Sequence, residues 1–123
     1  MIAKTVEGYR FGGYSDQSWG GQGYKSSSSS FLFSLKCHAG LSPTKMKVKS
    51  GKEGNAINIQ QRYGPIFGVN HDVWFGVNGS MKKGYFYLND TYEVPSGVSK
   101  TFLTGKSGRD KSFSIEEVEV FEV

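Results

Sequence analysis

The sequence is poor in cysteine and has no long hydrophobic run, and each shortage excludes a class of protein. A single cysteine, Cys37, excludes an internal disulfide and is typical of a reducing compartment. No stretch approaches the roughly 18 apolar residues of a membrane span. The N-terminus also lacks the apolar core of a secretory signal. We therefore expect a cytoplasmic protein that does not insert into a membrane.

Glycine and aromatic residues are, by contrast, abundant: the 123 residues include 17 glycines, nine phenylalanines and seven tyrosines. A glycine inside a helix costs about 1 kcal/mol, whereas aromatic side chains favour half-buried pleated surfaces. About nine short β-prone runs separated by turn residues predict one mainly β domain over residues 1–123, a two-sheet antiparallel β-sandwich with little helix. The net charge of +4 comes from scattered lysines, a pattern that does not indicate nucleic-acid binding.

The last β-prone run changes phase partway along. Phe113 and Ile115 share one face of an extended strand, whereas Val118 and Val120 fall on the other face. This slip predicts a β-bulge at residues 116–117, where one extra residue is inserted. The run also carries four glutamates, which we interpret as a solvated face that protects an edge strand. They are Glu116, Glu117, Glu119 and Glu122.

Residues 63–76 contain the neighbouring pair His71 and Asp72, set between β-prone runs at 65–69 and 73–77. These two runs predict a hairpin. Adjacent residues on a strand point to opposite faces, so the pair is poorly placed for catalysis. The sequence also lacks the Gly-x-Ser-x-Gly motif of a serine hydrolase. We therefore predict a protein that is not an enzyme, and His71 as a general base is the least favoured alternative.

Two alternatives from another class concern ligand binding. The first is a calcium site at Asp16, Asp72 and Asp90, since hard oxygen ligands in loops suit calcium. Such side chains in turns more often bond their own backbone. The second is a lectin-like face on which sugars stack on aromatic rings, although these rings could equally fill the core. The candidate rings are Trp19, Tyr24, Trp74 and Tyr92.

The order of the motifs resembles the middle and C-terminal parts of the TLDc domain family. The matching segments are Gly8-Tyr-Arg-Phe-Gly-Gly-Tyr-Ser with Trp19, then Phe31-Leu-Phe-Ser-Leu, then Tyr63-Gly-Pro-Ile-Phe-Gly with His71-Asp72, and finally Phe113-Ser-Ile-Glu-Glu-Val-Glu-Val-Phe. The resemblance implies a two-sheet antiparallel β-sandwich with no established catalytic centre. It also implies association with oxidative-stress protection and with binding of the proton-pumping vacuolar ATPase.

The chain departs from the family pattern in two places. Family members usually have helices and a strand pair ahead of the segment that matches Ile2, so this chain is either a fragment or a minimal member. A missing strand would leave an open sheet edge, which predicts a homodimer. The glycine-rich run after Phe67 is reduced here to Gly68-Val-Asn, so we expect Asn70 to adopt a positive backbone angle.

Together these observations predict a TLDc-like protein-interaction module without a cofactor, whose partner could be a vacuolar ATPase subunit. The predicted binding surface combines the loop at 16–19 with the loop at 68–72. Its candidate residues are Asp16, Trp19, Gly68, Asn70, His71 and Asp72.

Overall fold

The computed structural model describes the chain except for residues 61, 70, 78–79, 107–111 and 123. Ten strands account for most of the regular structure, together with one 3-10 turn, η1 (Glu53–Asn55). The strands are β1 (Ile2–Thr5), β2 (Arg10–Tyr14), β3 (Gly23–Lys25), β4 (Phe31–Lys36), β5 (Thr44–Lys47), β6 (Ile57–Ile59), β7 (Ile66–Phe67), β8 (Val73–Val77), β9 (Ser80–Phe86) and β10 (Ser112–Glu119). No helix in this described part of the chain is long and apolar enough to cross a membrane.

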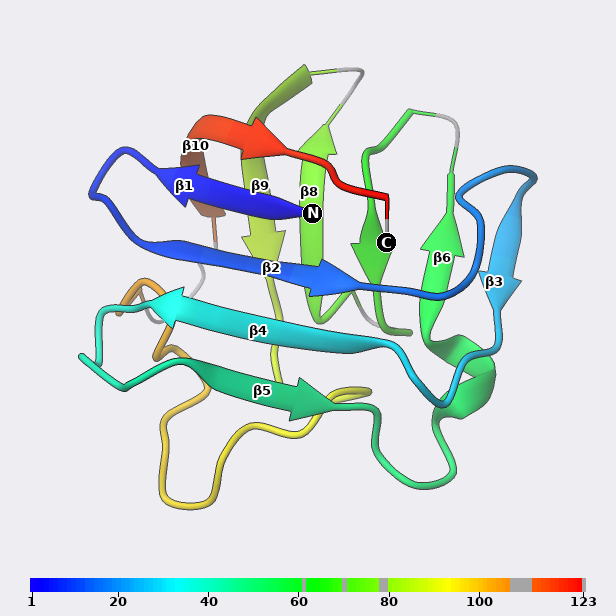
Figure 1. Cartoon of the computed structure of the whole chain (residues 1–123), viewed down its shortest axis with the longest axis horizontal. Helices are drawn as coiled ribbons and strands as arrows, with labels where there is room; N and C mark the ends of the chain where they lie inside the picture. The colour runs from blue at the N-terminus through cyan, green and yellow to red at the C-terminus, as the bar shows by residue number, and fades with distance from the viewer. Residues whose placement is uncertain (61, 70, 78–79, 107–111, 123) are drawn as a thin grey trace.

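The strands pair antiparallel in one continuous order, β3-β6-β7-β8-β9-β10-β1-β2-β4-β5. In Figure 1, β1, β2, β4 and β5 cross the front of the molecule, and β6, β8 and β9 run steeply behind them. We call β1, β2, β4 and β5 the front half, and β3, β6, β7, β8 and β9 the rear half. The predicted mainly β, antiparallel fold is confirmed. The prediction of two separate sheets is not confirmed, because β10 pairs both with β9 and with β1 and so joins the two halves.

The strand β10 contains the predicted bulge. Lys4 lies opposite Glu117 and Thr5 opposite Ile115, which leaves Glu116 as the extra residue. The Lys4 ammonium approaches the Glu116 carboxylate at 3.6 Å. The interpretation of the glutamates as protection of an edge strand was wrong, since β10 lies in the interior of the strand order.

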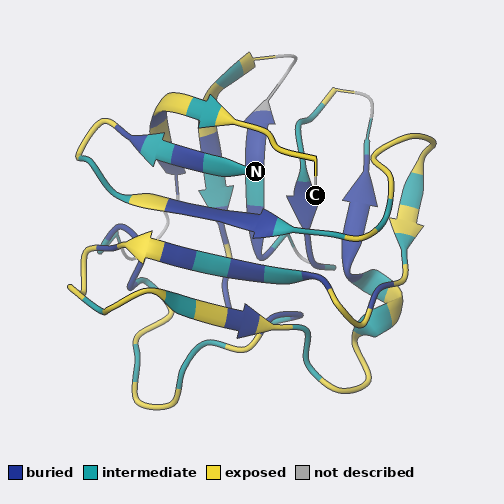
Figure 2. Cartoon of the chain, viewed as in Figure 1, coloured by how far each residue is buried: buried dark blue, intermediate teal, exposed yellow. Residues whose placement is uncertain are grey.

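The core fills the space between the two halves. The ring of Phe11, on β2, lies 6.1 Å from that of Phe75, on β8, and 4.9 Å from that of Phe113, on β10. Gly13 allows a further close contact, because a Cβ there would collide with the ring of Phe67. The burial colouring in Figure 2 follows this arrangement, with dark, buried stretches on strands of both halves.

Two stretches of loop-like composition contain strand residues. Residues 82–84 belong to β9, where Gly84 leaves room for the Phe113 ring of the neighbouring strand, because a Cβ at Gly84 would collide with that ring. The stretch at 15–30, which is rich in serine and glycine, contains the short strand β3, which pairs with β6.

The open edge does not lie at β1, which is paired with β10 and with β2. The outer strands of the described order are β3 and β5. The edge of β5 is partly covered, since the Glu93 N–H donates to the Lys47 carbonyl at 2.8 Å and Val48 forms a bridge with Tyr92. The homodimer stays a prediction, which sizing in solution tests.

Candidate binding groove

The turn between β7 and β8 completes the predicted hairpin, in which Phe67 lies opposite Val73. The His71 N–H donates to the Gly68 carbonyl at 3.3 Å, so the chain reverses over four residues. Positive φ angles occur at Gly68 (96°) and at His71 (58°). The predicted positive angle at Asn70 lies outside the described residues, and so does Asn70 as a candidate binding residue.

The Asp72 carboxylate is fully buried and holds the segment at 90–92 in place. Its oxygens accept hydrogen bonds from the N–H groups of Asp90 at 3.1 Å, Thr91 at 3.0 Å and Tyr92 at 3.0 Å. Burial raises the pKa of Asp72, and these backbone bonds work against that rise. Only glycine fits at position 68 beside this carboxylate, because a Cβ there would lie 2.8 Å from the Asp72 carboxyl carbon. We call this arrangement the Asp72 network.

Asp72 is therefore a structural residue, and its prediction as a partner-binding residue or a calcium ligand was wrong. The three carboxylates proposed as calcium ligands also do not lie together. In the part of the chain that is described, no three His, Cys, Asp or Glu side chains could hold one metal ion, so Asp16, Asp72 and Asp90 do not converge. The exposed Asp16 carboxylate instead accepts a 2.6 Å bond from the Ser27 hydroxyl, which lowers the pKa of Asp16.

His71 points away from Asp72 and lies against the outer aromatic side chains of the rear half. Its ring centroid is 5.1 Å from that of Trp74, and it is only partly exposed. Burial lowers the pKa of His71 from its usual 6.5. The predicted separation of the two side chains thus follows from a turn in which one residue faces inward and the other outward.

A pH dependence follows from this shift. Folded His71 holds its proton less tightly than the unfolded residue, so its contribution to stability is fully present above the unfolded pKa. It is lost as the pH falls through the lower, folded pKa. Asparagine tolerates the positive φ but does not titrate, so His71→Asn should lose less stability than the native protein between pH 7.5 and 4.5. Thermal melts across that range check this; equal slopes would contradict it.

The four rings proposed as one sugar-binding face do not all reach the surface, so that set of four was wrong. Tyr92 is completely buried, and its hydroxyl donates to the Ala56 carbonyl at 2.7 Å. Burial, and secondarily the Asp72 carboxylate, raises the pKa of Tyr92. Trp74 instead packs against Tyr63 at 4.5 Å and Tyr85 at 5.2 Å.

Trp19 occupies a different position, beside a large hollow. Its ring is 39% exposed and packs edge-on against Phe67 at 5.4 Å. The hollow has a volume of about 710 Å³, and we call it the Trp19 groove. Its lining residues are Met1, Gly13, Tyr14, Ser15, Asp16, Gln17, Ser18, Trp19, Pro65, Phe67, Val120, Phe121 and Glu122. A neighbouring hollow of about 320 Å³ is also lined by Trp19 and Pro65.

Hydrogen bonds between serines fix the loop that carries Trp19. The Ser30 hydroxyl donates to Ser27 at 2.8 Å and lies 2.9 Å from the Ser15 hydroxyl. Ser27 in turn donates to Asp16. These hydrogen bonds therefore fix the serine-rich segment that forms one wall of the groove.

The opposite wall comes from the segment after β10, which sequence reasoning did not assign to the site. Val120 is 73% exposed and Phe121 is 58% exposed, and both line the groove with Glu122. The one indication in the sequence was two apolar residues following a run of glutamates. Of the predicted site residues, Asp16 and Trp19 therefore lie in the groove, while His71 and the buried Asp72 are not among its lining residues.

The lining of the Trp19 groove is largely apolar, with carboxylates at positions 16 and 122, a composition that suits binding. In comparisons with known proteins, no curated sequence matches the chain. A family model does match, and residues 1–123 correspond to the one described as the TLDc domain. With the antiparallel β fold and the motif order described above, this match places the chain in the TLDc domain family.

Proposed function

We propose that the chain is a non-enzymatic, TLDc-type protein-interaction module that binds a segment of its partner in the Trp19 groove. The observation that carries the proposal is the gathering of exposed large apolar side chains around one hollow. Trp19, Val120 and Phe121 all line it and all remain accessible. Exposed apolar patches beside a concave surface are typical of interaction sites, and tryptophan is enriched among the residues that dominate binding.

The charges at the groove indicate the chemistry of the partner. Asp16 and Glu122 both line it, and the lowered pKa of Asp16 keeps that carboxylate ionised at neutral pH. The Met1 ammonium also lines the groove, but it donates to the Gly13 carbonyl at 2.8 Å, and burial lowers its pKa. The partner segment that fits carries one or more large apolar side chains flanked by lysine or arginine.

The separation of His71 from Asp72 supports the non-enzymatic part of the proposal, since the pair cannot act together. The family association makes a vacuolar ATPase subunit the first partner to test, in the cytoplasm and in connection with oxidative-stress protection. The lectin-like alternative has lost Tyr92 to the core, and the three carboxylates of the calcium alternative do not converge among the described residues, so we retain neither as a second candidate.

A direct test uses a phage-displayed peptide library selected on the purified native protein, followed by titration of the enriched peptides. We expect those peptides to combine aromatic or aliphatic residues with lysine or arginine. Trp19→Ala and Phe121→Ala should each weaken their binding about tenfold or more, because truncation of a dominant interface residue costs roughly 2 kcal/mol. Purified vacuolar ATPase subunits should show the same ranking of variants.

The matched control is Tyr87→Ala, which removes an aromatic side chain that is 49% exposed and is not among the groove-lining residues. It should leave peptide affinity unchanged. Peptides that bind Trp19→Ala as tightly as the native protein, or that carry acidic rather than basic residues, would show that the partner site lies elsewhere.

A further inference from the structure

The outer face of the front half carries a row of aromatic side chains. Along β4, Leu32 and Ser34 point into the core, whereas Phe31 and Phe33 point outward and remain partly exposed. The ring of Tyr14, on β2, continues this row: its centroid lies 5.2 Å from that of Phe31, and Phe31 lies 6.1 Å from Phe33. We call these three rings the aromatic row.

Lysines lie along one side of the aromatic row. On β5, Lys47 lies opposite Phe31 and Lys45 opposite Phe33, and both lysines are exposed. The Lys45 ammonium lies 4.0 Å from the centroid of the Phe31 ring, a cation–π contact. The lysines that looked scattered in the sequence thus come together where β5 pairs with β4.

At one end of the row, two cations face each other. Arg10 on β2 lies opposite Lys36 on β4, an arrangement that is destabilising for like charges. In the described ranges of the chain no ion pair joins Lys36, Lys45 or Lys47 to an acidic side chain, whereas Arg10 shares a small hollow with Glu117 and Glu119. Lysines without an acidic partner around partly exposed rings suit an anionic ligand.

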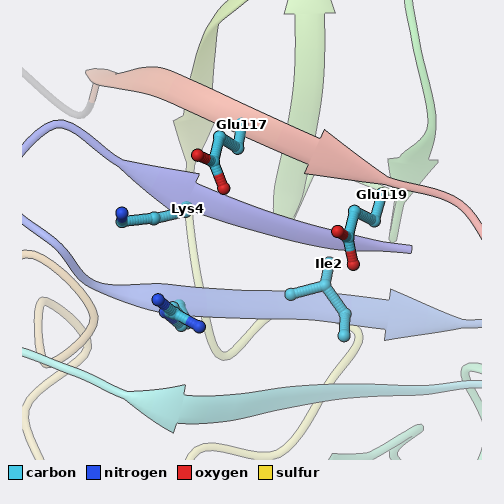
Figure 3. Close-up of a pocket in the computed structure, with 5 residues that line it drawn as sticks. Ile2, Lys4, Glu117 and Glu119 are labelled. Carbon is cyan, nitrogen blue, oxygen red and sulfur yellow. The ribbon is translucent and has the colours of Figure 1, made fainter.

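Two acidic side chains, Glu117 and Glu119, lie on β10, which is separated from β2 by β1 (Figure 3). Glu117 and Glu119 on β10 line a small hollow of about 60 Å³, together with Ile2, Lys4 and Arg10. In Figure 3 both carboxylates extend from β10 over β1. The face therefore changes from acidic at β10 to basic at β5, with the aromatic row beside the basic end.

We propose that this face binds single-stranded nucleic acid, with bases stacking on the aromatic row and phosphates contacting Lys36, Lys45 and Lys47. Stacking on aromatic rings beside a cationic track is the common mode of single-strand binding, because every base presents a π-face and every linkage a negative charge. An acidic peptide would satisfy the lysines, but it would not require three neighbouring rings. The proposal does not rest on the Trp19 groove, although Tyr14 belongs both to the aromatic row and to the lining of that groove.

The test measures the fluorescence anisotropy of a labelled 20-mer of deoxythymidine, titrated with the purified protein in 50–200 mM KCl. The double variant Lys45→Gln/Lys47→Gln should bind at least about tenfold more weakly. It should also reduce the slope of log affinity against log salt concentration by about 1.4, since each phosphate contact to a single strand contributes roughly 0.7. Phe31→Leu/Phe33→Leu keeps apolar cover over the strand but removes the rings, and it should weaken binding about fivefold or more per ring.

The matched control is Lys82→Gln/Lys83→Gln, an equal loss of charge from exposed lysines on β9 of the rear half. It should leave affinity and salt slope nearly unchanged, and thermal melts confirm that each variant is folded. Three results would overturn the proposal: no binding of the oligonucleotide at 50 mM KCl, equal losses in the two lysine variants, or full affinity in the leucine variant. Polyglutamate that competes as well as unlabelled oligonucleotide would assign the face to an acidic protein segment instead.

Discussion

Replacing Asp72 with alanine should lower the free energy of unfolding by about 4 kcal/mol, because it leaves the N–H groups of three successive residues without acceptors. Those groups, at residues 90–92, donate to a carboxylate with no solvent exposure. Water cannot replace the lost bonds without opening the structure, and each unsatisfied buried donor costs roughly 1–3 kcal/mol. Denaturant unfolding of the purified variant measures the loss.

Two substitutions sharpen the test of the Asp72 network. Asp72→Asn keeps one acceptor oxygen, so its loss should fall between those of the native protein and the alanine variant. Asp16→Asn makes the same chemical change at an exposed carboxylate and should have little effect on unfolding. If Asp72→Ala were as stable as Asp16→Asn, the carboxylate would not be what holds the segment at 90–92.

Phe11→Ala should lower the free energy of unfolding by about 3–5 kcal/mol, the usual cost of removing a buried phenylalanine side chain. The ring is 1% exposed and touches both Phe75 and Phe113. Since Phe75 belongs to the rear half and Phe113 to β10, the cavity would open where the two halves pack against each other. Equilibrium denaturation with urea measures the change.

The appropriate control is Phe121→Ala, which removes the same side chain from a position that is 58% exposed. That variant should unfold within about 0.5 kcal/mol of the native protein, as surface substitutions generally do. It also separates stability from binding, because it is expected to lose peptide affinity in the Trp19 groove. Equal destabilisation by the two variants would contradict the placement of the core.

The sequence predicted those strands in which apolar and polar residues alternate clearly and which are bounded by clear turn residues. The hairpin at β7 and β8 and the bulge at Glu116 follow from local alternation of apolar residues. The alternation does not reveal which strands become neighbours. Hence β10 was assigned to an edge although it lies between β9 and β1.

The site could be predicted only in part, for a related reason. The sequence pointed to Trp19 and Asp16 because a large ring in a polar loop stands out. It also pointed to Asp72, whose role depends on backbone groups 18–20 residues away, a distance at which no local pattern operates. Phe121 was missed because the contribution of the C-terminal segment to the groove depends on tertiary packing alone.

The position of β10 also has a consequence for how the chain folds. Ile2 pairs with Glu119, and the same strand provides the link from the front half to β9 in the rear half. Strand pairings between such distant residues make folding slow, because closing a long loop costs entropy before the pairing can stabilise the chain. During synthesis, β1 has no partner on its β10 side until the last strand has emerged. The front and rear halves must therefore be joined after translation of nearly the whole domain, and until then an unpaired strand edge is exposed to aggregation.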